Sequence, residues 1–192
     1  MLLSEINSDK KYTYADYLTW SEEIRVELIA GKVSEMSPAP YSIHQIISGN
    51  IFAALFLFCK SKNYKVLVAP FDVRFPEKGT EDHNITTVVQ PDICVICDKN
   101  KIDVRGCLGS PDLIVEIVSK STQKKDLNDK FNLYESTGVK EYWIVFPAEK
   151  YLSIYYLKDG FYNLKNNFEI GQQLTSHIFP DFKMEVEEVF AF

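Results

Sequence analysis

The apolar residues of this chain follow two patterns, one typical of buried strands and one typical of helices. Near-continuous apolar runs rich in Val and Ile occupy residues 88–97 and 113–118, as in strands that are buried on both faces. Comparable segments predict three further strands, at residues 65–75, 141–146 and 152–157. Polar loops are expected at residues 76–86 and 98–109, between these strands.

Helical periodicity of the apolar positions predicts three helices, at residues 14–20, 42–60 and 124–136. The third is expected to end just before Gly138, because glycine readily adopts the backbone conformation that stops a helix. A hairpin is predicted at Ala30-Gly31, between strands at residues 24–29 and 32–36, since Gly tolerates the positive φ of a tight turn.

The order of these elements predicts a single domain over residues 1–192, of the α/β class with mixed α+β organisation. We expect a central mixed β-sheet with helices on its faces. A chain of 192 residues is long enough for one domain with its own core and short for two. The predicted core spans about residues 12–158, and residues 159–192 are expected to add C-terminal strands and an amphipathic tail.

Composition narrows the class of protein. The chain has 46% hydrophobic and 25% charged residues, which is ordinary for a soluble globular domain. No segment approaches the roughly 20 apolar residues of a membrane-spanning helix, and the N-terminus lacks the pattern of a secretory signal. We therefore expect a cytoplasmic protein with no membrane partner. Cys94 and Cys97 are three residues apart on a predicted strand and would point to opposite faces, so we expect buried thiols rather than a zinc site.

The net charge of −6 argues against a protein that coats nucleic acid, because contacts to phosphates need exposed Lys and Arg. It does not exclude a nuclease, whose metal site is itself acidic.

Two acidic residues interrupt the apolar runs that predict buried strands. Asp92 lies in VVQPDICVIC and Glu116 in SPDLIVEIVS, where a sheet would ordinarily have another Val or Ile. A buried, ionised carboxylate is unfavourable unless a cation meets it. We therefore expect the two strands to be neighbours that direct both carboxylates at one point, where a divalent cation is bound.

A lysine interrupts the apolar stripe of the third predicted helix. Leu127 and Tyr134 belong to that stripe, and Lys130 lies between them on the same face. The side chain could extend past the helix edge to water, which is the more common outcome for such a lysine. However, only about five residues connect this helix to the strand of Glu116, so Lys130 is expected to lie over the end of that strand. There an ammonium beside two carboxylates and a metal ion would suit attack on a phosphodiester.

Two further residues are candidates with ordinary alternatives. Glu27 lies in the strand of the predicted hairpin on the face opposite Val26 and Leu28, and exposure to solvent would explain it equally well. His44 begins the apolar stripe of the helix at residues 42–60, where a hydrogen-bonded core histidine is the default interpretation.

Four segments in this order resemble the Uma2 family, also called DUF820, which is grouped with the PD-(D/E)xK restriction-endonuclease-like proteins. They are VELIAGKVSEMSPAP followed by a histidine, VVQPDICVI, PDLIVEIVSKST and DLNDKFNLYESTGVKEYWIV. The resemblance covers residues 12–190. It implies a restriction-endonuclease-like fold, a mixed sheet flanked by helices, with the active site at the splayed edge of the sheet.

The resemblance also implies roles for individual residues. Asp92 matches the first Asp of the motif, Glu116 its second acidic residue, and Glu27 the acidic residue that precedes the sheet core. The motif's lysine would stand two residues after Glu116, but that position is Val118. Lys130 is the best substitute, because related nucleases can supply the ammonium from the neighbouring helix.

The cofactor implied is Mg²⁺ or Mn²⁺, because the candidate ligands are oxygens and these ions keep several waters beside one or two carboxylates. We expect the carboxylates of Asp92 and Glu116 and the carbonyl oxygen of Ile117 to bind it. Gln123 and Asp126 lie near the start of the third helix and could line the cleft, although helix capping explains Asp126 as well.

Three hypotheses about function follow. The first is a metal-dependent endonuclease that hydrolyses DNA, with RNA not excluded and a homodimer expected if both strands are cut. The second is a catalytically inactive nuclease-like module that binds nucleic acid or a protein partner. The third is a purely structural network in which the acids pair with Lys130 and Arg25.

Overall fold

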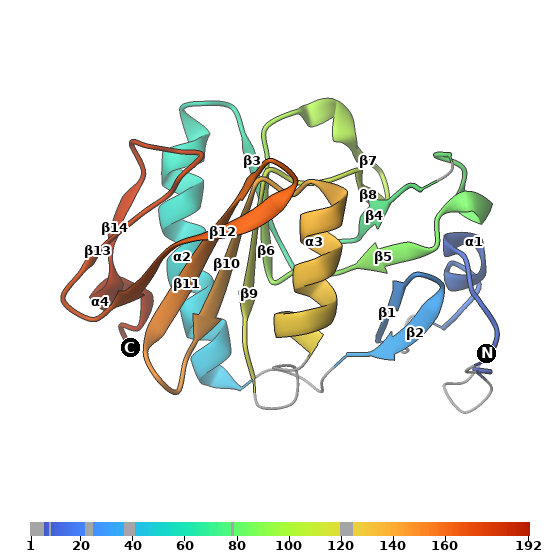
Figure 1. Cartoon of the computed structure of the whole chain (residues 1–192), viewed down its shortest axis with the longest axis horizontal. Helices are drawn as coiled ribbons and strands as arrows, with labels where there is room; N and C mark the ends of the chain where they lie inside the picture. Colours follow the sequence, from blue (N-terminus) through green and yellow to red (C-terminus); the bar gives the residue numbers. More distant parts are fainter. Residues whose placement is uncertain (1–5, 8, 22–24, 37–40, 78, 120–124) are drawn as a thin grey trace.

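The computed structural model describes the whole chain except residues 1–5, 8, 22–24, 37–40, 78 and 120–124 (Figure 1). Its central element is a six-stranded sheet in the order β12-β11-β10-β9-β6-β3. The bounds are β3 (Lys65–Val68), β6 (Ile93–Ile96), β9 (Leu113–Ile117), β10 (Glu141–Phe146), β11 (Tyr151–Lys158) and β12 (Phe161–Glu169). β9 and β10 are parallel, whereas the other neighbours are antiparallel, so the sheet is mixed, as predicted.

A second six-stranded sheet lies beside the first, in the order β2-β1-β5-β4-β8-β7 (Figure 1). Its strands are β1 (Val26–Ile29), β2 (Lys32–Glu35), β4 (Val73–Phe75), β5 (Thr87–Val89), β7 (Ile102–Asp103) and β8 (Gly106–Leu108). The prediction of one central sheet did not include it. The hairpin at its edge is confirmed, with positive φ at Ala30 (51°) and Gly31 (79°). β7 and β8 are short strands within the segment that was predicted to be a polar loop.

Two predicted strands are each divided between the sheets. The segment 65–75 forms β3 and β4, and the segment 88–97 forms β5 and β6. Each break contains a proline, Pro70 or Pro91. Proline has no N–H to donate to the ladder, so the chain leaves one sheet there and enters the other. The prediction of two continuous strands was wrong because the apolar pattern runs through each break.

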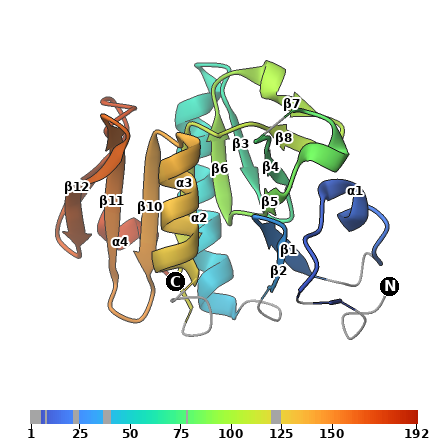
Figure 2. The same cartoon turned by 45° about the vertical axis from the view of Figure 1, so that its right-hand side comes forward.

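Helices cover both faces of the central sheet (Figures 1 and 2). They are α2 (Ser42–Lys60), α3 (Phe131–Thr137) and α4 (Val186–Val189), with a π-helical segment, Lys125–Lys130, leading directly into α3. A further α-helix, α1 (Tyr14–Tyr17), packs instead against the second sheet. α2 confirms its predicted bounds, and α3 ends at Gly138 with φ of 87°. Strand residues alternate between the two faces: Val115 packs in the core cluster beneath α2, and Ile114 packs in the cluster beneath α3.

By length and composition alone, α2 could cross a membrane, contrary to the expectation from sequence. The mean hydropathy of its most apolar window is 1.5, and 22% of that window is buried. Its buried residues pack in the core cluster of the central sheet, and they are Ile47, Ile51, Leu55 and Cys59. In this structure α2 is therefore a core helix with a partly exposed outer face.

The C-terminal segment packs against the same core. β13 (Gln173–Thr175) and β14 (Lys183–Glu185) form a two-stranded sheet that precedes α4. Apolar side chains from this segment join the cluster beneath α2, among them Phe182 and Val186. The two cysteines of the CxxC pair are divided as predicted, with Cys94 in the cluster beneath α3 and Cys97 against the cluster beneath α2.

Candidate active site

The strands that carry Asp92 and Glu116 are neighbours, as predicted. β6 and β9 pair antiparallel, with Ile93 opposite Val115. Asp92 is the residue before β6, and it accepts a hydrogen bond from the backbone N–H of Ile117, the residue that follows Glu116. The two acids therefore mark one end of the central sheet.

Glu116 is 4% exposed and faces α3, like its strand neighbour Ile114. Its Oε1 accepts two hydrogen bonds at 2.7 Å, from Lys130 Nζ and from the Tyr134 hydroxyl. Both donors come from the helix that follows β9, one from its π-helical turn and one from α3. The short connection between strand and helix thus brings a cation to the buried carboxylate, as the sequence predicted.

The ammonium of Lys130 also contacts a second buried acid. Lys130 Nζ lies 3.1 Å from Glu27 Oε1, and that oxygen accepts a hydrogen bond of 2.9 Å from the backbone N–H of Gln90. The exposed fractions are 5% for Lys130 and 1% for Glu27. The alternatives of a solvent-reaching lysine and a solvent-exposed Glu27 are therefore wrong.

Asp92 is held at the other side of the sheet end. Its Oδ2 accepts a hydrogen bond of 2.7 Å from the backbone N–H of Ile117 and lies 3.2 Å from His44 Nε2 on α2. Asp92 is thereby fixed to the residue next to Glu116 and, through His44, to the helix on the opposite face. His44 thus contacts a site residue directly.

This end of the central sheet is also where the two sheets meet. The residues Gln90, Pro91 and Asp92 connect β5 of the second sheet to β6 of the central one, and Glu27 belongs to β1 of the second sheet. The break at Pro91 therefore has a structural consequence: an acid from each sheet, Glu27 and Glu116, contacts the same lysine. Neither β1 nor α3 alone could assemble the cluster.

Four other residues considered in the sequence analysis are not part of this cluster as the structure describes it. Val118, at the position of the motif's lysine, packs in the apolar cluster beneath α3, the same side from which Lys130 reaches Glu116. Arg25 is exposed and takes no part in the ion pairs given by the described residues. Gln123 lies outside the described residues, and only the backbone of Asp126 is described.

Tyr134 is a site residue that the sequence analysis assigned only to the core. Burial, followed by the negative charge of Glu116, raises its pKa well above the usual 10, so the phenol stays protonated and donates to that carboxylate. A signal was available, because a buried tyrosine hydroxyl usually finds a partner and Tyr134 lies one turn after Lys130.

The donor chemistry of the cluster fits a hard divalent cation. The carboxylates of Glu116 and Glu27 both contact the ammonium of Lys130, and Asp92 lies at the same end of the sheet. Carboxylate oxygens are the ligands that hard divalent cations prefer. Among the residues that the structure describes, no group of three or more His, Cys, Asp and Glu side chains is arranged as a metal shell. Two carboxylates with water suit Mg²⁺, which usually binds through one or two carboxylates.

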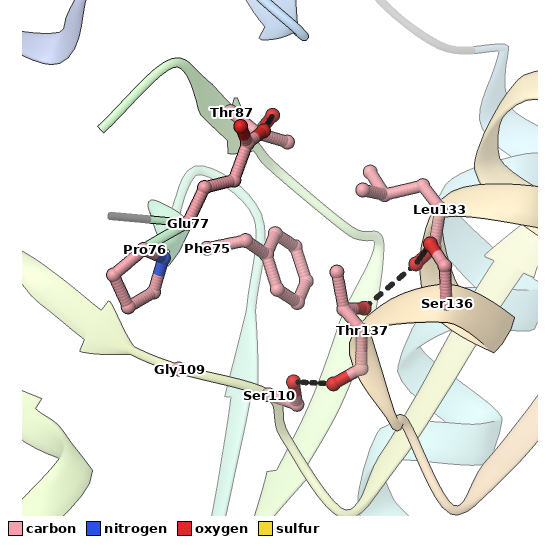
Figure 3. A pocket seen from close by; sticks show the side chains of 9 residues that line it. All are labelled: Phe75, Pro76, Glu77, Thr87, Gly109, Ser110, Leu133, Ser136 and Thr137. Atoms are coloured by element: carbon pink, nitrogen blue, oxygen red, sulfur yellow. Dashed lines mark hydrogen bonds between the residues drawn. The ribbon is translucent and has the colours of Figure 1, made fainter. Parts of the chain in front are cut away.

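A cavity of about 560 Å³ lies away from this cluster, at the C-terminal end of α3 (Figure 3). Ser110 Oγ donates to the carbonyl of Thr137 at 2.6 Å, and Glu77 accepts from the Thr86 hydroxyl at 3.1 Å. The residues that line this cavity are neutral apart from Glu77. The cavity therefore lacks the combination of acid and base found around Lys130.

Comparison with known proteins finds a similar solved structure and a matching family model, each over most of the chain. A crystal structure titled as "a putative nuclease belonging to DUF820", from Anabaena variabilis ATCC 29413, is similar with a TM-score of 0.72, 18% identity, and coverage of 94% of this chain and 98% of that one. No curated protein matches. The model of the Uma2 family, described as "Putative restriction endonuclease", matches residues 14–187. The restriction-endonuclease-like fold predicted from the sequence is confirmed, and the chain belongs to the Uma2 family.

Proposed function

We propose that this protein is a metal-dependent endonuclease that hydrolyses phosphodiester bonds of DNA. The observation that carries the proposal is the position of Lys130, whose ammonium lies 2.7 Å from Glu116 at the sheet end where Asp92 is also held. The family and the similar structure, both described as nucleases, support the same class of activity. Cutting both strands would need two sites, so we propose a homodimer as the active form.

Asp92, Glu116 and the carbonyl oxygen of Ile117 would hold Mg²⁺ or Mn²⁺ in this proposal. When bound, the ion supplies an activated water and offsets negative charge on the reacting phosphate. The hydrogen bond from the Ile117 N–H and the contact with His44 hold Asp92 in one orientation.

The remaining residues of the cluster act on charge and orientation. Lys130 presents a fixed ammonium, which stabilises negative charge that develops on the phosphate. Glu27 also contacts that ammonium and is itself fixed by the Gln90 N–H. Tyr134 donates to Glu116 and thereby orients its carboxylate.

A second candidate is an inactive nuclease-like module that binds nucleic acid or a protein partner. The valine at position 118 in place of the motif's lysine and the net charge of −6 favour it. The contacts of Lys130 with Glu27 and Glu116 also fit the third hypothesis, a purely structural network that neutralises buried acids.

Nicking of supercoiled plasmid DNA separates these candidates. We expect the wild type to nick in Mg²⁺ or Mn²⁺ and not in chelator, and Lys130→Met to lose activity. Lys140→Met is the matched control, because Lys140 is an ion-paired lysine at the opposite end of the same strands. DNA binding that persists in chelator, with no nicking in either metal, would instead establish the binding module.

A further inference from the structure

A second cavity, of about 510 Å³, opens directly beside Asp92. It lies between the N-terminal half of α2 and the connection from β3 to β4, which is tied to the site by a hydrogen bond of 3.1 Å from the Ala69 N–H to the Asp92 carbonyl. The side chains that give it its chemistry are those of Arg25, His44, Gln45, Ser48, Phe52 and Asp92. Its volume is within the range of small-molecule sites.

The lining suits a flat, neutral, hydrogen-bonding group. Phe52 contributes an aromatic ring, which stacks on Phe56 with centroids 5.6 Å apart, and Gln45 and Ser48 contribute an amide and a hydroxyl. Stacking on an aromatic ring combined with hydrogen bonds to amide and hydroxyl groups is how proteins hold unpaired bases.

Charge around the cavity agrees with a nucleic-acid strand passing the site. Arg25 is exposed and lines the cavity, so it can contact a phosphate next to the enclosed base. Asp92 lines the cavity too, and it is a ligand of the metal in the proposed function. A base held there would therefore belong to a nucleotide adjacent to the phosphate that is cut.

We propose that this cavity, which we call the base pocket, binds an unpaired nucleobase of the DNA strand that is cleaved. The inference rests on the proposed function and adds a substrate preference to it: single-stranded or locally unpaired DNA over fully paired duplex. Extracting a base from the stack has an energetic cost that an already unpaired base avoids.

Gly49 offers a direct way to fill the base pocket. Gly49 lines the cavity, and a Cβ built on this glycine meets no atom within 4 Å. Gly49→Leu therefore adds a side chain at the wall of the cavity, where a bound base would meet it. Ala53→Leu is the matched control, because Ala53 is exposed, lies one turn further along α2 and does not line the cavity.

The test is fluorescence anisotropy with a labelled short single-stranded DNA and its duplex, in Ca²⁺ instead of Mg²⁺ so that binding is measured without cleavage. We expect the wild type and Ala53→Leu to prefer the single strand, and Gly49→Leu to lose that preference by about tenfold, the effect of one stacked base. Phe52→Leu, which keeps apolar volume and removes the ring, should weaken binding of the single strand in the same direction.

Equal binding of single strand and duplex by the wild type, or unchanged binding by Gly49→Leu, would overturn the base pocket. So would tighter binding of RNA of the same sequence, or saturation by free deoxyadenosine monophosphate as tight as by the strand, which would indicate a different ligand. Because this experiment measures binding, its result is independent of the proposed function. If the wild type does not nick DNA but Gly49→Leu still loses the preference for single strands, the nuclease is refuted and the base pocket is supported.

Discussion

At each end of the β6–β9 strand pair, an aspartate that follows a proline accepts a backbone hydrogen bond, but the charges around the two aspartates differ. At one end Asp92, after Pro91, accepts a hydrogen bond from the N–H of Ile117 on the neighbouring strand. At the other end Asp112, after Pro111, accepts one of 2.8 Å from the N–H of Cys97. Each aspartate thus accepts a hydrogen bond from a backbone N–H at the end of the neighbouring strand, a group that would otherwise need another partner. A Pro-Asp pair is thus explained at both ends by local structure alone.

What separates the ends is the balance of charges. Asp112 pairs with Lys140 at 2.7 Å, one acid with one base, and the Lys140 side chain is 64% exposed. At the Asp92 end two buried acids, Glu27 and Glu116, both contact the ammonium of Lys130, and that lysine is itself buried. The comparison teaches that the surplus of buried acid, rather than the Pro-Asp sequence, marks the candidate site.

Replacing each aspartate gives the sharpest contrast. Asp92→Asn removes a proposed metal ligand, and we expect plasmid nicking to fall by about 10²-fold or more. Asp112→Asn keeps a hydrogen-bond acceptor for the Cys97 N–H and should retain nicking within a few-fold. Comparable losses in both variants would erase the functional distinction between the two ends.

Removing each lysine tests the burial of charge. Lys130→Met leaves Glu27 and Glu116 without their shared cation and should lower the free energy of unfolding by about 3–5 kcal/mol. Lys140→Met should lower it by no more than about 1 kcal/mol, because the exposed ammonium is screened by water. Urea unfolding monitored by circular dichroism measures both. Adding Glu27→Gln to Lys130→Met should restore part of the loss; equal stabilities of the two lysine variants would contradict the account.

A pair of tyrosines allows a finer contrast. Tyr134→Phe removes a hydrogen bond to a carboxylate, which is worth about 1.5–3 kcal/mol, and should also lower nicking by about tenfold through a less ordered Glu116. Tyr162→Phe removes a hydrogen bond of 2.9 Å to the carbonyl of Val139, near the Asp112 end, and should affect stability alone. Stability and nicking are measured on both variants; reduced nicking in Tyr162→Phe as well would argue against a specific role for Tyr134.

The smallest expected effect is on pH dependence. Burial raises the pKa of Asp112, but hydrogen bonds from Lys140 and the Cys97 N–H outweigh it, so the pKa is lowered from 3.8. A lowered folded-state pKa stabilises the protein above the unfolded pKa of about 3.9, and this contribution is lost as pH falls further through the folded value. Urea unfolding from neutral pH to below pH 4 should therefore show that the free energy of unfolding declines less steeply in Asp112→Asn than in the wild type. The same decline in both proteins would show that this ion pair does not contribute.

Much of the fold was predictable because its signals are local. The bounds of α2 and β10 follow from periodicity and from continuous apolar runs. The division of residues 65–75 and 88–97 between two sheets was not predicted, because burial in either sheet produces the same apolar pattern. The prolines at 70 and 91 were the available signal, but which sheet each half joins depends on distant pairing.

The site was predictable where residues violate the pattern around them. Asp92, Glu116 and Lys130 each stand where an apolar side chain belongs, and the structure brings Lys130 to Glu116 as expected. Tyr134 was not predicted as a site residue, because a tyrosine is an ordinary member of an apolar helical stripe. The backbone N–H of Gln90, which holds Glu27, carries no side-chain signal and depends on how the sheets meet.

Calorimetric titration of Mn²⁺ tests most directly whether the acidic end of β6–β9 is a metal site. We predict saturable binding to the wild type and to Asp112→Asn, and its loss in Glu116→Gln. Absence of binding to the wild type, or equal affinity in Glu116→Gln, would contradict the account and leave the cluster around Lys130 as a structural ion network.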